Sequence, residues 1–362
     1  MNKETSIYLD AVRFIAALFV FIDHLSGQRL TGGFLWQLAP AGGEAVIVFF
    51  ILSGFVIGYV TDTRERDFRT YAVNRMARIL SVAVPALALT FVLDSIGFFE
   101  NPGLYLSDRT FLVPSRLVQY SASALFVHQL WGINITPGTI LAYWSLGYEV
   151  WYYLIFAVAV FAPPKYRWIG AAAAVLIAGP KIALLLPIWL AGVGLYRLCS
   201  KHVPPPSVGW AMFAGSILLW VSFEVWCARY GRLFIAPRYL LPRIEIPQDY
   251  IVACLFAANL YGFRAISHIF RPVFLPVERI IRWMAGATFS LYLIHQPVTQ
   301  IIVSISPWST ESWPHRALVT AGTLVVVFLF AEFTERKKNV WRHWIEDSFA
   351  AIRAAINRGR ES

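Results

Sequence analysis

The chain has 362 residues, of which 58% are hydrophobic and 14% charged, and its mean hydropathy is +0.58. This composition excludes an ordinary soluble domain, and apolar runs along the whole length predict an all-α, polytopic membrane protein. The net charge of +10 does not indicate nucleic-acid binding, because the basic residues gather in short segments between the apolar runs, as in cytoplasmic loops. The lipid bilayer is therefore the predicted partner.

Hydrophobic windows predict a bundle of about ten transmembrane helices, near residues 12–30, 44–60, 79–99, 139–161, 168–180, 182–198, 208–227, 250–266, 286–304 and 316–334. With the N- and C-termini in the cytoplasm, the three most basic segments, which are 61–78, 264–285 and the tail after Glu335, lie on the inner face. The window 168–180 is short for a bilayer core of about 30 Å. We expect the apolar stretch 115–127 to stay outside as a re-entrant or interfacial piece. The basic segment 228–249 then also lies outside, against the charge rule.

The two ends of the chain differ in character. Residues 1–335 are expected to form one transmembrane domain, and residues 336–362 a basic cytoplasmic tail. Apolar tail residues recur every three or four positions, which predicts an amphipathic helix on the anionic inner leaflet; they are Trp341, Trp344, Ile345, Phe349, Ile352 and Ile356. Cys199, Cys227 and Cys254 show no spacing typical of a disulfide or a metal site, and we expect all three to be buried packing residues.

Ionisable side chains interrupt the first predicted span, which is otherwise apolar from Val12 to Leu25. Its strongly apolar residues contribute roughly −3 to −5 kcal/mol to insertion, whereas one central Arg or Asp costs about +2.5 to +3.5 kcal/mol. Such residues usually mark a functional site. Arg13 and His24 are eleven residues apart, a rise of about 16 Å along a helix, so an Arg13 at the inner interface places His24 in the outer half of the membrane.

A neutral imidazole can take a proton from a hydroxyl near pH 7, so His24 is a candidate base, and Asp23 beside it could tune that basicity. Asp10 lies three residues before Arg13 on the same helix face and could hold it as an ion pair. The alternative is a hydrogen-bonded core histidine with an arginine that extends to the interface.

The segment Phe49 to Gly54 opens the second span. Gly54 and Gly58 form a pair of small residues four apart, which lets another helix approach closely, so packing is the favoured role of this segment. Ser53 could still face a cavity.

Arg75 and Arg78 lie on one face of the turn that leads into the third span. Two guanidinium groups at a cytoplasmic, membrane-proximal position suit a pyrophosphate or a 3′-phosphate. Lipid headgroups would suit them equally well.

Two later spans carry polar residues at their entrances. Ser145 and Glu149 share one helix face next to Trp144, and Glu149 is expected to point inward, where it could orient an imidazole, bind an acceptor hydroxyl or accept bonds from neighbouring Tyr and Trp donors. Tyr292 and His295 precede Pro297 in another span. His295 could line the cavity or merely bond a carbonyl that Pro297 leaves free.

Five segments in this order are similar to motifs of the acyltransferase family 3 integral membrane proteins, which include Nod-factor and O-antigen acetylases. They are Tyr8 to Arg13 with His24, in an Arg-x10-His pattern; Phe49 to Gly54; Arg75-x-x-Arg78; Trp144-Ser145-Leu146-x-x-Glu149; and Ser290 to His295. Each motif alone has low specificity, but the ordered set spans most of the chain. The chain thus resembles a stand-alone membrane domain of that family, described as having about ten membrane helices.

The resemblance implies a multi-pass enzyme of the bacterial inner membrane that moves an acyl group, often acetyl, from cytoplasmic acyl-CoA to a hydroxyl of a saccharide or another envelope-related acceptor. It implies acetyl-CoA or a related thioester as co-substrate and no metal. His24 would be the base, with Arg13 and Glu149 in the catalytic set, and Arg75 and Arg78 would bind coenzyme A phosphates. The remaining cavity candidates are Asp10, Asp23, Ser53, Trp144, Ser145, Tyr292 and His295.

Two other functions stay open at this point. Intramembrane His, Glu and Arg residues also build the pathways of transporters, so a flippase of an envelope glycan or lipid precursor is the main rival. The chain lacks the internal repeat that many transporters show. A structural scaffold for glycan synthesis is the third possibility, and in that case His24 would be dispensable.

Overall fold

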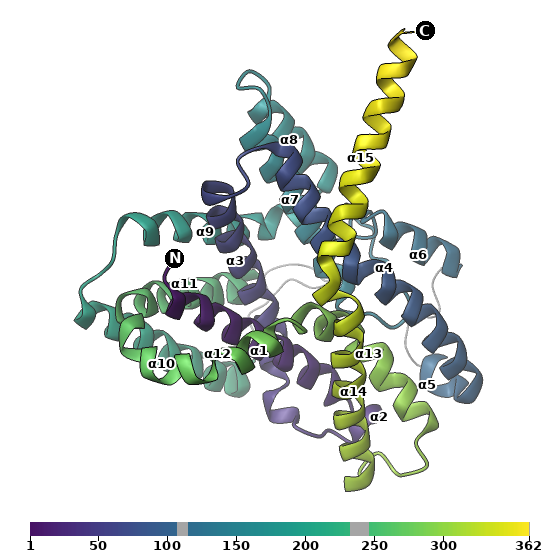
Figure 1. Ribbon diagram of the computed structural model, residues 1–362. Coiled ribbons are helices and arrows are strands. Elements are labelled where there is room, and N and C mark those ends of the chain that lie inside the picture. The colour runs from purple at the N-terminus through teal and green to yellow at the C-terminus, as the bar shows by residue number, and fades with distance from the viewer. Residues whose placement is uncertain (107–114, 232–245, 362) are drawn as a thin grey trace.

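The computed structural model describes residues 1–106, 115–231 and 246–361, and every regular element in these ranges is a helix (Figure 1). The prediction of an all-α bundle is therefore confirmed. The longer helices are α1 (Lys3–Leu25), α3 (Pro40–Thr63), α4 (Phe68–Glu100), α7 (Tyr143–Phe161), α9 (Pro180–Lys201), α10 (Pro206–Tyr230), α11 (Ile246–Ile266), α12 (Arg271–Ala285), α13 (Thr288–Ile305), α14 (Trp313–Phe333) and α15 (Lys338–Glu361). The shorter elements are α2 (Gln28–Thr31), η1 (Trp36–Leu38), α5 (Pro102–Leu106), α6 (Arg116–Ala124), α8 (Arg167–Ala178), η3 (Ser267–Phe270) and η4 (Glu335–Lys337).

Eight helical stretches in the described ranges are long and apolar enough to cross a membrane. They cover eight of the ten predicted windows, and the other two windows form α8 and α13. With 12 residues, α8 rises only about 18 Å, well short of a core of about 30 Å. With 18 residues, α13 is long enough, but buried Ser, His, Gln and Thr side chains make it more polar than the other spans.

The stretch 115–127 does not form a spanning helix. It contains α6, which has nine residues, and α6 is followed by a loop that returns to the start of α7. A helix of this length covers less than half of a bilayer core. The basic segment 228–249 runs from the end of α10 into residues 232–245, which lie outside the described residues, so its position stays a prediction.

Glycines bring α3 and α9 into backbone contact. A Cβ atom at Gly54 of α3 would lie 2.0 Å from the carbonyl oxygen of Trp189, and one at Gly192 of α9 would lie 2.2 Å from the carbonyl oxygen of Ile51. One turn further along α3, a Cβ at Gly58 would meet the Tyr196 ring at 3.0 Å. The close approach predicted from Gly54 and Gly58 is therefore confirmed, and it holds Ser53 next to α9.

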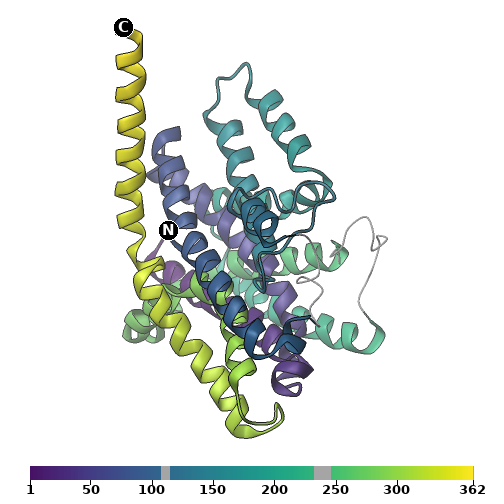
Figure 2. The same ribbon diagram turned by 90° about the vertical axis from the view of Figure 1, so that its right-hand side faces the viewer.

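The core of the bundle is built around α1, α3, α4 and α13. In it α3 packs against α1 and α9, while α13 packs against α1, α4 and α14. Outside this core, α10 packs mainly against α11, and most of its side chains are exposed, as expected of a lipid-facing helix. Figures 1 and 2 show the α7–α8 hairpin and α15 projecting on the same side of the bundle.

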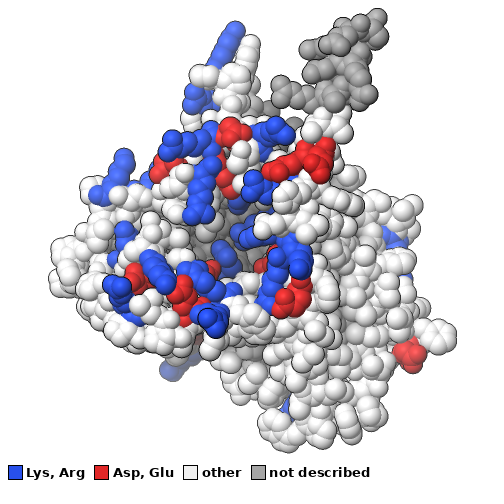
Figure 3. Space-filling model, viewed as in Figure 1, with Lys and Arg blue, Asp and Glu red and all other residues white. Residues whose placement is uncertain are grey.

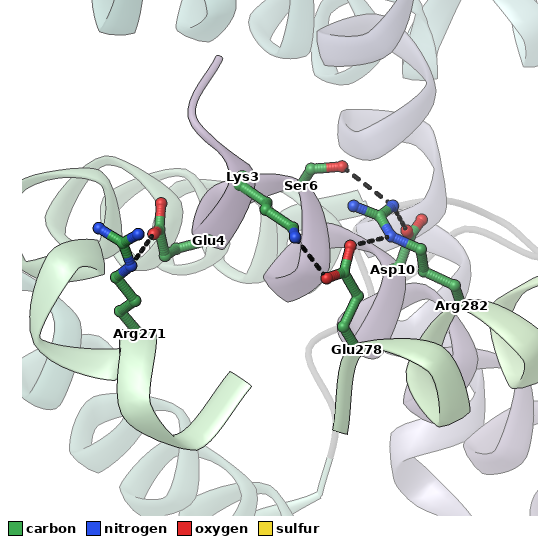
Figure 4. Close-up of polar contacts among 7 residues, drawn as sticks. All are labelled: Lys3, Glu4, Ser6, Asp10, Arg271, Glu278 and Arg282. Carbon is green, nitrogen blue, oxygen red and sulfur yellow. Dashed lines mark hydrogen bonds and ion pairs between the residues drawn. The ribbon is translucent and has the colours of Figure 1, made fainter. Parts of the chain in front are cut away.

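The basic segment 264–285 forms η3 and α12, and ion pairs join α12 to the first half of α1 (Figure 4). The Lys3 ammonium lies 2.6 Å from Glu278, which also accepts a 2.9 Å bond from Nε of Arg282. Arg282 reaches across to the Asp10 carboxylate at 2.9 Å. Since Asp10 lies one turn before Arg13, these contacts fix the helix turn from which Arg13 projects.

The three cysteines and the C-terminal helix α15 differ in how far they are buried. Cys199 and Cys227 are buried, but Cys254 is exposed on α11, so the prediction of three buried cysteines is wrong for Cys254. Residues 338–361 form α15, which packs against α4 and exposes Trp344 and Phe349.

Candidate functional site

A cavity of about 790 Å³, including its open mouth, lies among α1, α3, α4, α7, α13 and η4. Seven of the twelve predicted site residues line it: Arg13, Ser53, Arg75, Arg78, Ser145, Glu149 and Tyr292. The other lining residues are Val46, Phe49, Phe50, Leu52, Val56, Ile79, Leu146, Tyr153, Thr288, Phe289 and Glu335. Polar residues from all five motifs, which are far apart in sequence, therefore face one space.

Charged residues are concentrated on one part of the molecular surface. In Figure 3, Lys and Arg side chains, with Asp and Glu among them, gather around a hollow, while the lower part of the same face carries few charges. The cavity brings Arg13, Arg75 and Arg78 together with Glu335. The lining guanidinium groups supply donors for charge-assisted hydrogen bonds to an anionic ligand.

Arg13 is held only loosely by its predicted partner. Its guanidinium lies 3.8 Å from the Asp10 carboxylate, whereas the same carboxylate lies 2.9 Å from Arg282. Asp10 itself does not line the cavity. Because Arg282 is the nearer partner of Asp10, the Arg13 guanidinium keeps donors for a ligand.

The two arginines of the Arg75-x-x-Arg78 motif are in different situations. Arg75 is buried and donates a 2.8 Å bond to Glu65, and its guanidinium lies 5.8 Å from the Tyr71 ring and 5.7 Å from the Tyr153 ring. In the described part of the chain no ion pair or side-chain hydrogen bond is formed by the Arg78 guanidinium, although it lines the cavity. Arg78 is therefore the better placed of the two to bind an anion.

Glu149 is the acceptor of a small polar cluster in the cavity wall. One of its oxygens accepts a 2.8 Å bond from the Ser53 hydroxyl and a second bond from the Tyr153 hydroxyl. The Trp189 indole donates to Ser53 at 3.1 Å. The described contacts of Glu149 do not include the His24 ring, and its bond from Tyr153 agrees with the alternative of an acceptor for neighbouring donors. A role in binding a ligand hydroxyl stays a prediction.

The Ser145 and Tyr292 hydroxyls lie 2.6 Å apart and join α7 to α13 in the cavity. Tyr292 is the lining residue furthest along α13, and the Phe49 ring packs edge-on against it at 5.4 Å. Thr288, one turn earlier, also lines the cavity. This side of α13 therefore runs from the mouth of the cavity toward the membrane interior.

Glu335 caps the first turn of α13. Its carboxylate accepts bonds from the backbone N–H groups of Phe289 at 3.2 Å and Ser290 at 2.9 Å, and from the Ser290 hydroxyl at 3.0 Å. A carboxylate at a helix N-terminus is stabilised by the unpaired N–H groups and by the helix dipole. Through these bonds Glu335 anchors the segment after α14 to the first turn of α13, at the cavity wall.

The two intramembrane histidines contact each other. Nδ1 of His24 lies 2.7 Å from Nε2 of His295, and Nδ1 of His295 lies 2.7 Å from the Leu291 carbonyl oxygen. Neither ring lines the cavity described above. His295 follows Tyr292 by three residues, about 4.5 Å along α13, so the histidine pair lies just beyond the deepest lining residue of that helix.

The interpretation of His295 as a mere partner for a carbonyl freed by Pro297 does not fit this geometry. In an α-helix Pro297 leaves the carbonyl four residues earlier, that of Leu293, without its donor. His295 bonds Leu291 instead. The contact of His295 with His24 therefore has to be explained by something other than the proline.

Asp23 and Trp144 do not join the cavity. The Asp23 side chain lies against Gly42 of α3, where an added Cβ would come within 2.3 Å of it. The Trp144 ring packs edge-on against Tyr148 at 5.1 Å. In the ranges that the structure describes, no group of three or more His, Cys, Asp and Glu side chains could hold a metal ion.

Sequence reasoning missed four residues of this region: Glu65, Tyr153, Arg282 and Glu335. Glu65, Arg282 and Glu335 each act through a partner in another part of the fold, as Glu65 does with Arg75. Tyr153 follows Glu149 by one helical turn, and this spacing alone could have suggested it. The other three lie at or beyond helix ends, where local sequence gives no sign of the partner.

A second, mostly apolar groove of about 890 Å³ lies among α1, α3, α10 and α11. Its polar lining residues include Tyr8, Glu44, Ser216 and Asn259, and the Trp220 indole donates to Glu44. None of the predicted site residues lines it. The cavity with the arginines is therefore the candidate active site.

The chain is similar to known proteins over most of its length. A family model described as an acyltransferase domain matches residues 6–332, nearly the whole chain. The exopolysaccharide production protein ExoZ of Rhizobium meliloti (strain 1021) is 28% identical over 304 residues, which cover 78% of this chain and 86% of that protein.

Two further relatives match over shorter stretches. The O-acetyl transferase of Shigella phage Sf6 is 31% identical over 159 residues, which cover 42% of this chain and 45% of the phage protein. The acyltransferase MdmB of Streptomyces mycarofaciens is 31% identical over 159 residues, covering 41% of this chain and 37% of that protein. No solved structure matches the chain.

Proposed function

The chain belongs to acyltransferase family 3 and is a membrane acyltransferase, and from this premise we propose that it transfers an acyl group, in the first place acetyl, from acyl-CoA to a hydroxyl of a saccharide or another envelope-related acceptor. The observation that carries the proposal is the arginine-lined cavity, whose lining reaches Tyr292, three residues before the His295 that bonds His24. The names of two relatives, an O-acetyl transferase and an exopolysaccharide production protein, support oxygen as the accepting atom and a saccharide as the acceptor.

The donor end of the proposal rests on Arg13 and Arg78. Both line the cavity, and each keeps guanidinium donors that no strong described partner occupies. Phosphate oxygens of coenzyme A can accept these bonds, and charge-assisted bonds are stronger than neutral ones. Arg75 is bound to Glu65, so we assign the phosphate contacts first to Arg13 and Arg78.

The cavity wall between the arginines and the histidines suits the pantetheine arm. The arm carries amide groups that need hydrogen-bond partners and methylene groups that need apolar contact. Glu149 with Ser53 and Tyr153 supplies the former, and Phe49 and Phe50 supply the latter. In this arrangement the thioester lies near Tyr292, at the end of the cavity closest to the histidine pair.

In the chemical step we assign His24 as the general base. The proton of the acceptor hydroxyl moves to His24 while the acceptor oxygen attacks the thioester carbonyl carbon. The carbon–sulfur bond then breaks, and the departing sulfur takes that proton from the imidazolium, which gives free CoA and an ester. Proton transfer by a positioned side chain contributes typically 10²–10⁴-fold to rate.

The proposal is tested with purified protein in lipid bilayers, given acetyl-CoA labelled in the acetyl group and a pool of saccharide and non-saccharide alcohols. The expected result is label in alkali-labile esters, reduced at least about 100-fold by His24→Gln. His128→Gln is the control, because His128 is a buried histidine that lies in the loop after α6 and does not line the cavity. If folded protein leaves all label on CoA, the proposal fails.

A transporter remains the rival with a distinct readout. Membership of an acyltransferase family argues against it. The same bilayers, loaded with a labelled glycan precursor and no acyl-CoA, measure movement of the precursor across the membrane. Transport in this assay, together with no ester formation, would favour the rival.

We also propose that the protein lies in the bacterial inner membrane with both termini in the cytoplasm. The positive charge of segments 61–78 and 264–285 supports this orientation. The tail helix α15 would then face the anionic inner leaflet with exposed Trp344 and Phe349. Labelling of single cysteines with an impermeant reagent in intact cells and in inverted vesicles tests the orientation.

A further inference from the structure

The histidine pair has a defined geometry that the proposed transfer does not by itself require. His295 is completely buried on α13. In the described part of the chain it contacts His24 and the Leu291 carbonyl, and the Phe21 ring packs against it in a T-shaped arrangement. The two imidazole planes are inclined by only 16°. With 2.7 Å between the facing nitrogens, this is a hydrogen bond directed along the ring planes.

The bond to Leu291 decides where the protons are. A carbonyl oxygen only accepts, so Nδ1 of His295 must carry a hydrogen. If His295 also carried a hydrogen on Nε2, it would be a fully buried cation, which is costly without a paired anion, and no carboxylate is among its described contacts. His295 is therefore neutral, and its Nε2 is an acceptor.

The position of the hydrogen on the His24 ring follows from that of His295. Because Nε2 of His295 accepts, Nδ1 of His24 must be the donor at 2.7 Å. A neutral His24 then has its hydrogen on Nδ1 and its lone pair on Nε2. The chain of donors runs from His24 through His295 to the Leu291 carbonyl.

We propose that His295 is the positioning residue of the acyl transfer: by accepting the Nδ1–H of His24 it holds that imidazole in the tautomer whose Nε2 takes the acceptor proton. The catalytic part of this inference rests on the proposed function, whereas the tautomer assignment does not. When Nε2 takes the proton, His24 becomes an imidazolium, and its Nδ1–H bond to His295 strengthens because a charged donor forms a stronger bond. The proton leaves again with the CoA sulfur, so neither ring keeps a charge after turnover.

The tautomers are directly measurable. Solid-state ¹⁵N NMR of histidine-labelled protein in bilayers distinguishes a hydrogen on Nδ1 from one on Nε2. We expect the Nδ1–H form for both His24 and His295, assigned by the loss of each signal in His24→Asn and His295→Asn. His128 and His315 are internal controls, because they contact the carbonyl oxygens of Tyr143 and Leu30 through Nε2 and must show the opposite form. An Nε2–H signal from His24 or His295 would overturn the assignment.

A pair of variants tests the role in catalysis. In His295→Gln the side-chain oxygen can take the place of Nε2 and still accept from His24. In His295→Asn the shorter amide can still donate to Leu291 but cannot reach His24. We expect kcat within about 10-fold of wild type for the Gln variant and at least about 100-fold lower for the Asn variant, with the KM for acetyl-CoA changed less than about threefold in both.

Each outcome has one meaning. Equal activity of the Gln and Asn variants would show that the acceptor at this position has no catalytic role, and would overturn the proposal. If both variants fail to fold, the NMR assignment on wild-type protein still decides the tautomer. If wild-type protein shows the expected tautomers but transfers no acyl group to any alcohol, the proposed function fails and the structural assignment stands.

Discussion

Replacing Arg78 by Gln should weaken binding of acyl-CoA without weakening binding of a donor that lacks the nucleotide. The Arg78 guanidinium lines the cavity and forms no described ion pair, so its removal breaks no strong internal contact. A hydrogen bond to a charged group is worth about 1.5–3 kcal/mol, which corresponds to a KM for acetyl-CoA about 10- to 150-fold higher. Folding should be unaffected.

The assay compares acetyl-CoA with acetyl-pantetheine as donors, measured as ester formed with a saturating alcohol. Arg78→Gln should lower kcat/KM for acetyl-CoA and leave that for acetyl-pantetheine within about twofold, because the smaller donor has no phosphate. Arg342→Gln is the control, since Arg342 is exposed on α15 and pairs with Glu346. Equal losses with both donors would place Arg78 outside the phosphate site and refute this reasoning.

Arg75 provides the contrast within the same motif. Its buried pair with Glu65 at 2.8 Å means that Arg75→Gln leaves a carboxylate unpaired, which costs about 3–5 kcal/mol. We expect a lower Tm in detergent for Arg75→Gln and partial recovery in the double variant with Glu65→Gln. A single variant as stable as wild type, but with an increased KM, would show that Arg75 serves the ligand instead.

Three other properties follow from the structure. Gly54→Ala should destabilise the α3–α9 contact strongly, because its Cβ would lie 2.0 Å from a carbonyl oxygen, whereas Gly215→Ala, inside α10 with open space around it, should not lower Tm. Burial lowers the pKa of His128 from its ordinary 6.5 to about 4. As the pH falls, the unfolded chain therefore binds a proton at His128 before the folded chain does. The free energy of unfolding should fall by up to about 3 kcal/mol as the pH drops from 6.5 to 4. Thermal denaturation across this range should show a smaller fall in His128→Gln, and equal falls would contradict the assignment. Glu149→Gln should raise the KM for acetyl-CoA by about 10-fold and lower kcat less than His24→Gln does, and steady-state kinetics that show the reverse order would place Glu149 in the chemical step.

Motif spacing predicted which arginines lie near the site, but it did not predict their partners. The Arg75-x-x-Arg78 spacing predicted two equivalent phosphate ligands, because both side chains lie on one helix face. Glu65 lies outside that helix and occupies one of them, and no rule of spacing along α4 could reveal this. Similarly, Asp10 was expected to hold Arg13. The nearer partner of the Asp10 carboxylate is instead Arg282 of α12, which lies 272 residues after Asp10 in the sequence.

The sequence by itself determined that this protein is an all-helical membrane protein, where most of its helices lie, and that α3 meets another helix at Gly54. These properties depend on hydropathy and side-chain size, which are local to each segment. Only the tertiary structure decided that residues of five motifs share one cavity, that Glu335 caps α13 and that His24 bonds His295. Those contacts join residues up to 271 positions apart, and their geometry depends on how the helices pack, which no single segment encodes.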